Sequence, residues 1–130
     1  MRLPTALRGE LLRAASVALP WEACGLVGGT GDDLVRFIAC RNAAGSPYRY
    51  TISPEDVLGA LRVFERQGLG LRAIFHSHPA GEARPSATDI REAMYPGVLH
   101  LILGAPPNRQ LRAFWIEAGQ VREEPLEDGD

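Results

Sequence analysis

Short apolar runs alternate with amphipathic helical segments along the chain, and this alternation limits the fold more than any other feature. Hydrophobic spacing predicts helices at 5–18, between Ser53 and Gly68, and at 87–94. The expected strands lie at 24–29, 34–40, 49–52, 71–75, 98–104 and 110–117, with 120–123 a candidate for one more. No linker or repeat interrupts this order, so we expect one α/β domain with a mixed β-sheet flanked by helices.

Local signals at the ends of these segments support the assignment. Thr5 is expected to cap the first helix, and Pro20 ends it because proline cannot continue a helix. Ser53 can cap the second helix, and Pro54 suits its first position. The sequence TGDD at residues 30–33 supplies the turn of a hairpin between the first two strands.

Length and charge narrow the class of protein further. The 130 residues suffice for one compact domain, which we place at 1–122. The last eight residues, EEPLEDGD at 123–130, hold five of the 16 acids and predict a disordered acidic tail. The remaining 14 arginines against 11 acids are too weakly basic to indicate nucleic acid. No apolar run approaches the ~20 residues of a membrane span, so we expect a cytoplasmic protein that binds no membrane.

A pair of histidines follows directly on a buried strand. Residues 71–75, LRAIF, lead into His76 and His78, which share one face because side chains alternate along a strand. Pro79 ends the strand, since it has no backbone N–H for the ladder. Both imidazoles can therefore face one cleft.

A serine and an aspartate follow after a short link. Ser86 is expected to cap the helix at 87–94, and Asp89 lies in its first turn, where the helix dipole keeps a carboxylate ionised. Two imidazoles and a carboxylate form a ligand set for Zn²⁺ with one coordination position open for water. Ser86 is close enough to donate a hydrogen bond to an oxyanion, whereas the base that such a site needs must come from elsewhere.

The whole pattern resembles a known family. HSHP, six residues and SATD match the HxHP-x6-SxxD signature of the JAMM (MPN+) zinc metallopeptidases, in a compact prokaryotic-type form. That family also carries a glutamate before its first strand, and PWEACGLVGG at 20–29 offers Glu22. The resemblance extends over about residues 5–120 and implies a cytidine-deaminase-like architecture. It implies His76, His78 and Asp89 as ligands of one zinc ion, Glu22 as the general acid/base and Ser86 as the oxyanion donor.

The same resemblance implies a zinc-dependent isopeptidase or peptidase. Its substrate would be a ubiquitin-like or sulfur-carrier protein, cut at the amide after a C-terminal Gly-Gly, and a homodimer is left open. A catalytically silent interaction module is one alternative, although a scaffold has no physical need for the complete residue set. A zinc hydrolase of small amides, such as a deaminase, is another, but its PCxxC run is missing here.

The remaining candidates have plainer interpretations. Ser77 points away from the histidine face and is expected to be structural. Cys24 and Cys40 are expected to be reduced core thiols. Trp21 is expected to pack, and His100 to be a hydrogen-bonded histidine of the core or of a sheet edge.

Overall fold

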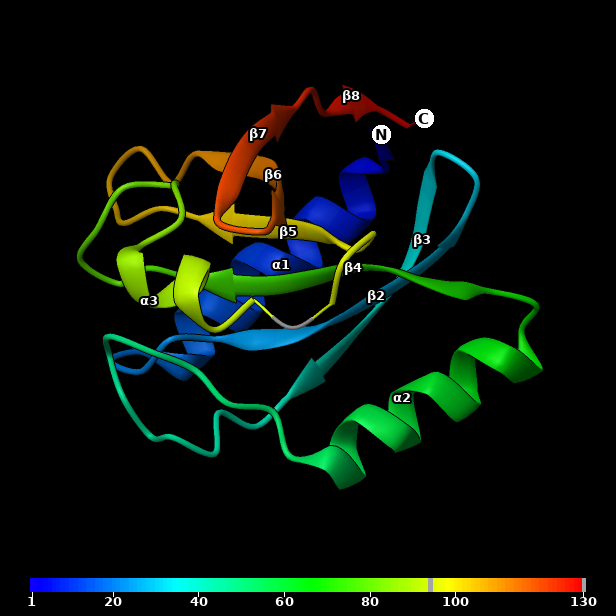
Figure 1. Cartoon of the computed structure of the whole chain (residues 1–130), viewed down its shortest axis with the longest axis horizontal. Coiled ribbons are helices and arrows are strands. Elements are labelled where there is room, and N and C mark those ends of the chain that lie inside the picture. Colours follow the sequence, from blue (N-terminus) through cyan, green and yellow to red (C-terminus); the bar gives the residue numbers. More distant parts are fainter. Residues whose placement is uncertain (94, 130) are drawn as a thin grey trace.

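One mixed sheet organises the chain, which is described at residues 1–93 and 95–129 of a computed structural model. Among these residues, eight strands lie in the order β7-β6-β5-β4-β2-β3-β1-β8 (Figure 1). The strands are β1 (Arg2–Leu3), β2 (Cys24–Thr30), β3 (Asp33–Cys40), β4 (Gly70–Ser77), β5 (Leu99–Leu103), β6 (Leu111–Glu117), β7 (Gln120–Glu124) and β8 (Glu127–Asp128). The helices are α1 (Thr5–Ala18), α2 (Pro54–Arg66) and α3 (Ala87–Arg91). This is the α/β architecture that the sequence predicts.

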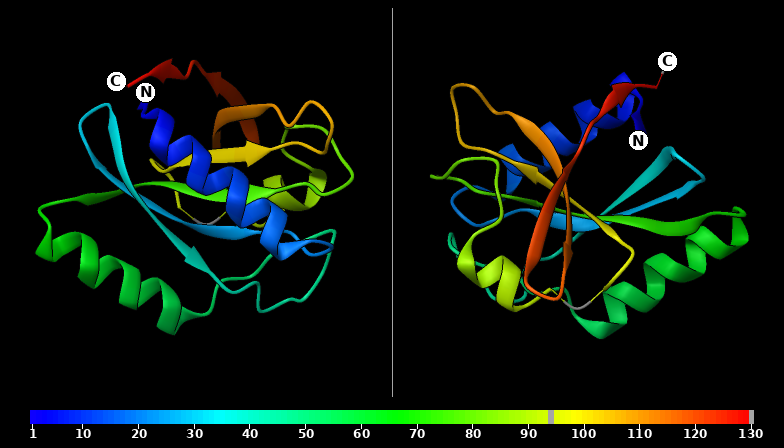
Figure 2. Two further views of the ribbon diagram at one scale, coloured as in Figure 1. Left: turned by 180° about the vertical axis from the view of Figure 1, so that it is seen from behind. Right: turned by 45° about the horizontal axis from the view of Figure 1, so that its top comes forward.

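The helices cover both faces of the sheet, with α1 on one side and α2 and α3 on the other (Figure 2). Leu7 and Leu11 of α1 pack against Phe75 and its neighbours on the first face. Phe64 of α2 packs against Ile74 on the second face. Residues 73–77 of β4 and all of β5 are therefore buried on both sides, which explains why apolar residues predominate there.

The strand directions place the end of β4 next to α3. β4 and β5 are parallel, so the chain must cross over between them, and α3 lies in that crossover. β2 runs antiparallel to β4, with Cys24 opposite His76. The start of β2, the end of β4 and the start of α3 consequently meet at one end of these central strands.

The helix starts agree with the sequence, apart from the cap of α1. The Ser53 hydroxyl oxygen accepts the Asp56 N–H at 3.1 Å, with Pro54 at the first helical position, as predicted. The N-cap of α1 is Pro4, so Thr5 is its first residue instead of its cap. α3 ends at Arg91, earlier than the expected residue 94, which lies outside the described residues.

The strand predicted at 49–52 is wrong. This segment is irregular because the Asn42 side chain occupies backbone groups that a neighbouring strand would need. The Asn42 amide donates to the Arg49 carbonyl oxygen at 3.0 Å, and its oxygen accepts the Thr51 N–H at 3.1 Å. The Ala43 N–H adds a bond to the Thr51 carbonyl oxygen.

The acidic end of the chain is ordered where the sequence predicted disorder. β7 extends to Glu124, and Glu127 and Asp128 of β8 pair with Arg2 and Leu3 of β1. The short strand β1 offers backbone groups at the sheet edge, and backbone pairing there outweighs the polar composition of the tail. The domain limits of 1–122 stay a prediction. No helix in the described residues is long and apolar enough to cross a membrane.

Candidate active site

His76 and His78 project from the end of β4, where their rings are fixed in different ways. The His76 side chain is fully buried. The His78 backbone N–H donates to the Leu103 carbonyl oxygen at 2.8 Å, which continues the pairing with β5 past the end of β4. The His78 Nδ1–H donates to the Glu82 carbonyl oxygen at 2.7 Å. That bond fixes the tautomer and leaves the Nε2 lone pair facing the site.

Asp89 reaches the histidine pair from the first turn of α3. Ser86 and Asp89 form a reciprocal capping box: the Asp89 N–H donates to the Ser86 hydroxyl, and Asp89 Oδ2 accepts the Ser86 N–H at 2.9 Å. Burial alone would raise the pKa of Asp89, but its interactions with the His76 and His78 imidazoles and the hydrogen bond from the Ser86 N–H hold that pKa well below its usual range. The carboxylate therefore stays ionised although it is buried.

The three side chains converge on one point. Asp89 Oδ2 lies 3.1 Å from both His76 Nε2 and His78 Nε2, and the two nitrogens are 3.2 Å apart. Ligands about 2.0–2.2 Å from a tetrahedral Zn²⁺ would be separated by about 3.3–3.6 Å. Because His78 presents a lone pair here, the cluster needs a shared proton or a cation between these atoms. The donor set and spacing thus fit a metal ion.

Glu22 lies on the other side of the same cluster. One ligand atom each of Glu22, His76 and His78 lie within 4.8 Å of one another, so these residues are also positioned to hold a metal ion. Asp89 Oδ2 lies 3.1 Å from each of the same two histidine nitrogens. Two carboxylates, those of Asp89 and Glu22, thus lie close to the histidine pair.

The Glu22 carboxylate is buried, and its pKa is raised. Its Oε1 has no hydrogen-bond partner within the described residues. Burial raises the pKa of Glu22 to about 8, with His78 opposing this shift and Asp89 adding to it. A carboxyl group in that range can both take and return a proton near neutral pH.

Backbone bonds on both sides hold Glu22 in place. The Glu22 N–H donates to the Ser46 carbonyl oxygen at 2.9 Å, and the Asn42 amide donates to the Glu22 carbonyl oxygen at 3.1 Å. The next residue, Ala23, donates its N–H to the Ser77 hydroxyl at 2.8 Å and accepts the Ser77 N–H. Ser77 is thus structural, as the alternation along its strand predicted.

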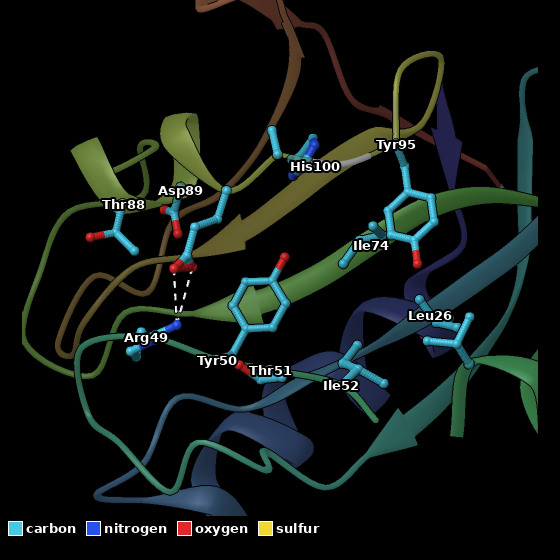
Figure 3. Close-up of a pocket in the computed structure, with 13 residues that line it drawn as sticks. Leu26, Arg49, Tyr50, Thr51, Ile52, Ile74, Thr88, Asp89, Tyr95 and His100 are labelled. Atoms are coloured by element: carbon cyan, nitrogen blue, oxygen red, sulfur yellow. Dashed lines mark hydrogen bonds and ion pairs between the residues drawn. The ribbon is translucent and has the colours of Figure 1, made fainter. Parts of the chain in front are cut away.

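A pocket of about 310 Å³ adjoins the cluster at Asp89. Figure 3 shows it between the 49–52 segment and α3, with Tyr50 in the middle and an Arg49–Glu92 ion pair of 2.9 Å on one side. The pocket is lined by Leu26, Arg49, Tyr50, Thr51, Ile52, Val57, Ile74, Thr88, Asp89, Glu92, Ala93, Tyr95 and His100. Tyr50 also stacks on His76, which sequence reasoning missed because the contact depends on tertiary packing.

Several minor expectations changed. Cys24 is buried and free, as predicted, whereas Cys40 is free but only partly buried. Trp21 does not pack fully, since 46% of its surface is exposed. His100 is buried, yet neither ring nitrogen has a hydrogen-bond partner in the described part of the chain, so the expected hydrogen bonds are missing.

Comparisons with known proteins agree with the fold and the site. The chain is 41% identical over 114 residues to a probable TtuB-protein conjugate cleaving protease of Thermus thermophilus, covering 87% of this chain and 71% of that one. It is 35% identical over 111 residues to a CysO-cysteine peptidase of Mycobacterium tuberculosis, covering 82% and 76%. A solution structure from Desulfitobacterium hafniense superposes with a TM-score of 0.88 at 37% identity, covering 98% and 92%.

The family assignment rests on a sequence match that extends over most of the chain. The sequence profile described as prokaryotic homologs of the JAB domain matches residues 4–117, which include all five residues of the expected site. The predicted resemblance to the JAMM class is confirmed by this match. The chain belongs to the family of prokaryotic homologs of the JAB domain.

Proposed function

We propose that this chain is a zinc-dependent peptidase that hydrolyses the amide bond after the C-terminal Gly-Gly of a ubiquitin-like or sulfur-carrier protein. The observation that carries the proposal is the convergence of His76 Nε2, His78 Nε2 and Asp89 Oδ2 at 3.1–3.2 Å. The relatives named as a conjugate cleaving protease and a CysO-cysteine peptidase support the substrate class. A silent interaction module would have no use for this buried polar cluster.

His76, His78 and Asp89 would hold the zinc ion. When bound, zinc lowers the pKa of water and polarises a carbonyl group. The Asp89 carboxylate contributes its negative charge, and the Glu82 carbonyl oxygen keeps the His78 ring in the tautomer that binding requires.

Glu22 would move the proton during the reaction. Its carboxylate removes a proton from the attacking water and returns that proton to the nitrogen of the leaving amine. Burial beside His78 and Asp89 gives it a pKa suited to both steps. The leaving amine therefore has to lie on the Glu22 side of the cluster.

Ser86 would stabilise the developing oxyanion. Its hydroxyl oxygen already accepts the Asp89 N–H at 3.0 Å, which uses a lone pair and leaves the O–H hydrogen free. That hydrogen can be donated to the substrate carbonyl oxygen as charge builds on it. One side chain would thus cap α3 and take part in catalysis.

The test of this proposal changes the Gly-Gly residues in the tail of the substrate protein. Purified zinc-loaded protein is offered a sulfur-carrier protein extended beyond its Gly-Gly, and the same protein with Gly-Gly changed to Val-Val. We expect cleavage of the first at the glycine and little cleavage of the second. Equal cleavage of both proteins, or cleavage only of unrelated unfolded peptides, would refute the proposal and indicate a general peptidase.

The proposal also covers the compartment and the oligomeric state. We propose that the protein acts in the cytoplasm and has no nucleic-acid or membrane partner. A homodimer is the oligomeric state to test, by light scattering of the purified protein.

A further inference from the structure

The Asn42 side chain lies at the centre of the loop that joins β3 to α2. Within the described residues it makes five hydrogen bonds, all to backbone groups. Its amide nitrogen donates to three carbonyl oxygens, those of Glu22 at 3.1 Å, Ser46 at 3.3 Å and Arg49 at 3.0 Å. Its oxygen accepts two N–H groups, those of Ala44 at 3.0 Å and Thr51 at 3.1 Å. Because backbone N–H groups only donate and carbonyl groups only accept, these partners fix which end of the amide is the nitrogen.

Backbone bonds close the same segment, residues 42–51, into a compact loop. The Ala43 N–H donates to the Thr51 carbonyl oxygen at 2.8 Å, so the two ends of the loop lie side by side. The Gly45 N–H donates to the Asn42 carbonyl oxygen at 3.1 Å and turns the chain at the start of the loop. Removing the Asn42 amide would take a partner from both ends of this loop at once, and each freed backbone group would be destabilising.

Glu22 is attached to this loop through its own backbone. Its N–H donates to the Ser46 carbonyl oxygen at 2.9 Å, and its carbonyl oxygen accepts the bond from Asn42. β2 begins only at Cys24, so Glu22 precedes the strand and its ladder. The bonds between Ala23 and the sheet fix the next residue of the chain. The direction of the Glu22 carboxylate therefore depends on the position of the loop.

The same loop reaches a metal-binding histidine through Tyr50. Asn42 bonds to the backbone on both sides of this residue, at the Arg49 carbonyl oxygen and at the Thr51 N–H. The Tyr50 ring stacks on the His76 imidazole. Figure 3 shows Arg49, Tyr50 and Thr51 in succession along one side of the pocket. One side chain thus holds the loop that fixes Glu22 and carries the ring that contacts His76.

We propose that Asn42 is a positioning residue that holds Glu22 and Tyr50 in place beside the zinc ion, so that one side chain controls both turnover and zinc affinity. The part on turnover rests on the proposed function, whereas the part on zinc affinity involves no substrate. Asn42 acts through these two residues. A displacement of a catalytic group by about 1 Å can slow a reaction on the order of 10²-fold, so a small shift of the loop has a large effect.

Zinc affinity tests the link to Tyr50. Asn42→Ala should lower zinc affinity by about tenfold or more, as loss of an outer orienting group does, measured by competition with a chelator. The double variant with Tyr50→Leu tests the route, because two changes that act through one contact are not additive. Asn42→Ala should add little to the loss that Tyr50→Leu causes alone. Losses that multiply, or parental affinity in Asn42→Ala, would overturn this link.

Turnover tests the link to Glu22. With zinc in excess, Asn42→Ala should lower kcat by about 10–100-fold and leave KM nearly unchanged. In a Glu22→Gln background the same change should alter kcat by less than about twofold, because the group that Asn42 positions is no longer there. A loss by the same factor in both backgrounds, or a change in KM alone, would overturn this link.

A second variant serves if Asn42→Ala does not fold. Asn42→Asp keeps the oxygen that accepts the Ala44 and Thr51 N–H groups and loses the donor for the three carbonyl oxygens. It should keep more zinc affinity than Asn42→Ala but still lose turnover. Parental kcat in Asn42→Asp would overturn the role of the amide nitrogen.

Asn108 supplies the matched control. It is an exposed asparagine in the turn between β5 and β6, so Asn108→Ala should equal the parent in zinc affinity and kcat. Equal losses in Asn108→Ala and Asn42→Ala would overturn the proposal. If the parent cleaves no Gly-Gly substrate, the proposed function fails, and the zinc-affinity cycle with Tyr50→Leu still decides whether Asn42 positions Tyr50.

Discussion

The Tyr50 ring lies against the His76 imidazole, with ring centroids 4.6 Å apart and planes inclined by 23°. His76 Nδ1 is buried and has no hydrogen-bond partner in the described residues. A metal-binding histidine is ordinarily oriented by a hydrogen bond from its second nitrogen. Here the stacked phenol ring takes over that task and directs His76 Nε2 toward Asp89.

Replacing Tyr50 should therefore weaken zinc binding. Tyr50→Leu removes the flat contact and should lower zinc affinity about 10–100-fold, the range found when an outer orienting group is lost. Tyr50→Phe keeps the ring and should retain most of the affinity. Affinities are measured by competition with a chelator. Tyr95→Leu, in the same pocket but without a described stacking contact, is the control; an equal loss there would contradict the orienting role.

Metal binding and turnover should separate between two variants. His76→Ala should lose zinc, because two remaining ligands rarely hold the ion. Glu22→Gln should keep equimolar zinc by metal analysis but lose turnover on the order of 10²-fold or more. If Glu22→Gln cleaves as fast as the parent, another group is the base.

Ser86→Ala should affect both stability and rate. Loss of the cap costs about 1 kcal/mol of unfolding free energy, and loss of an oxyanion donor raises the activation barrier by about 3–4 kcal/mol. Thermal melting and kcat report the two effects. Ser53→Ala removes the cap of α2 away from the site, so it should lower stability without lowering kcat. A Ser86→Ala protein that melts lower but keeps its rate would show a cap only.

The zinc-free protein should lose stability as pH rises. Burial raises the pKa of Glu22 from 4.5 to about 8, so between these values the folded state holds a proton that the unfolded state has released. This contribution to the unfolding free energy therefore falls across that window and levels off above about pH 8. Urea titrations at pH 5 and pH 8 should show a smaller decline for Glu22→Gln.

The exposed acid Glu10 of α1 supplies the control for this pH effect. Glu10→Gln should follow the parent at both pH values. A decline of equal size in the parent and in Glu22→Gln would mean that other groups cause it.

The sequence alone was sufficient to predict the site residues that lie close to one another along the chain. His76 and His78 share a strand face, and Ser86 and Asp89 share a helical turn, so their spacing alone brings them together in pairs. Glu22 lies 54 residues before His76, and their proximity depends on the register of β2 against β4. Sequence periodicity cannot fix that register, which is why only the family resemblance identified Glu22.

The sequence predictions that proved wrong concern groups whose structure depends on contacts with distant parts of the chain. The segment at 49–52 alternates like a strand, but the Asn42 side chain takes up backbone groups on one side of it. The acidic tail has a disordered composition, yet β1 supplies a strand for it to pair with. The missing partners of His100 could likewise not be read from the apolar run around it, because burial does not reveal which polar atoms are satisfied.

Two hydrogen bonds between Ala23 and Ser77 hold Glu22 next to His76. These bonds do not depend on the length of the loops between the two residues. Residues can consequently be inserted at the hairpin turns, such as 31–32 or 118–119, without moving Glu22 relative to His76. Deleting a single residue between Glu22 and Cys24 would instead turn the carboxylate to the opposite face of the sheet. The fold can thus acquire new surface loops for new protein partners while its reaction stays the same.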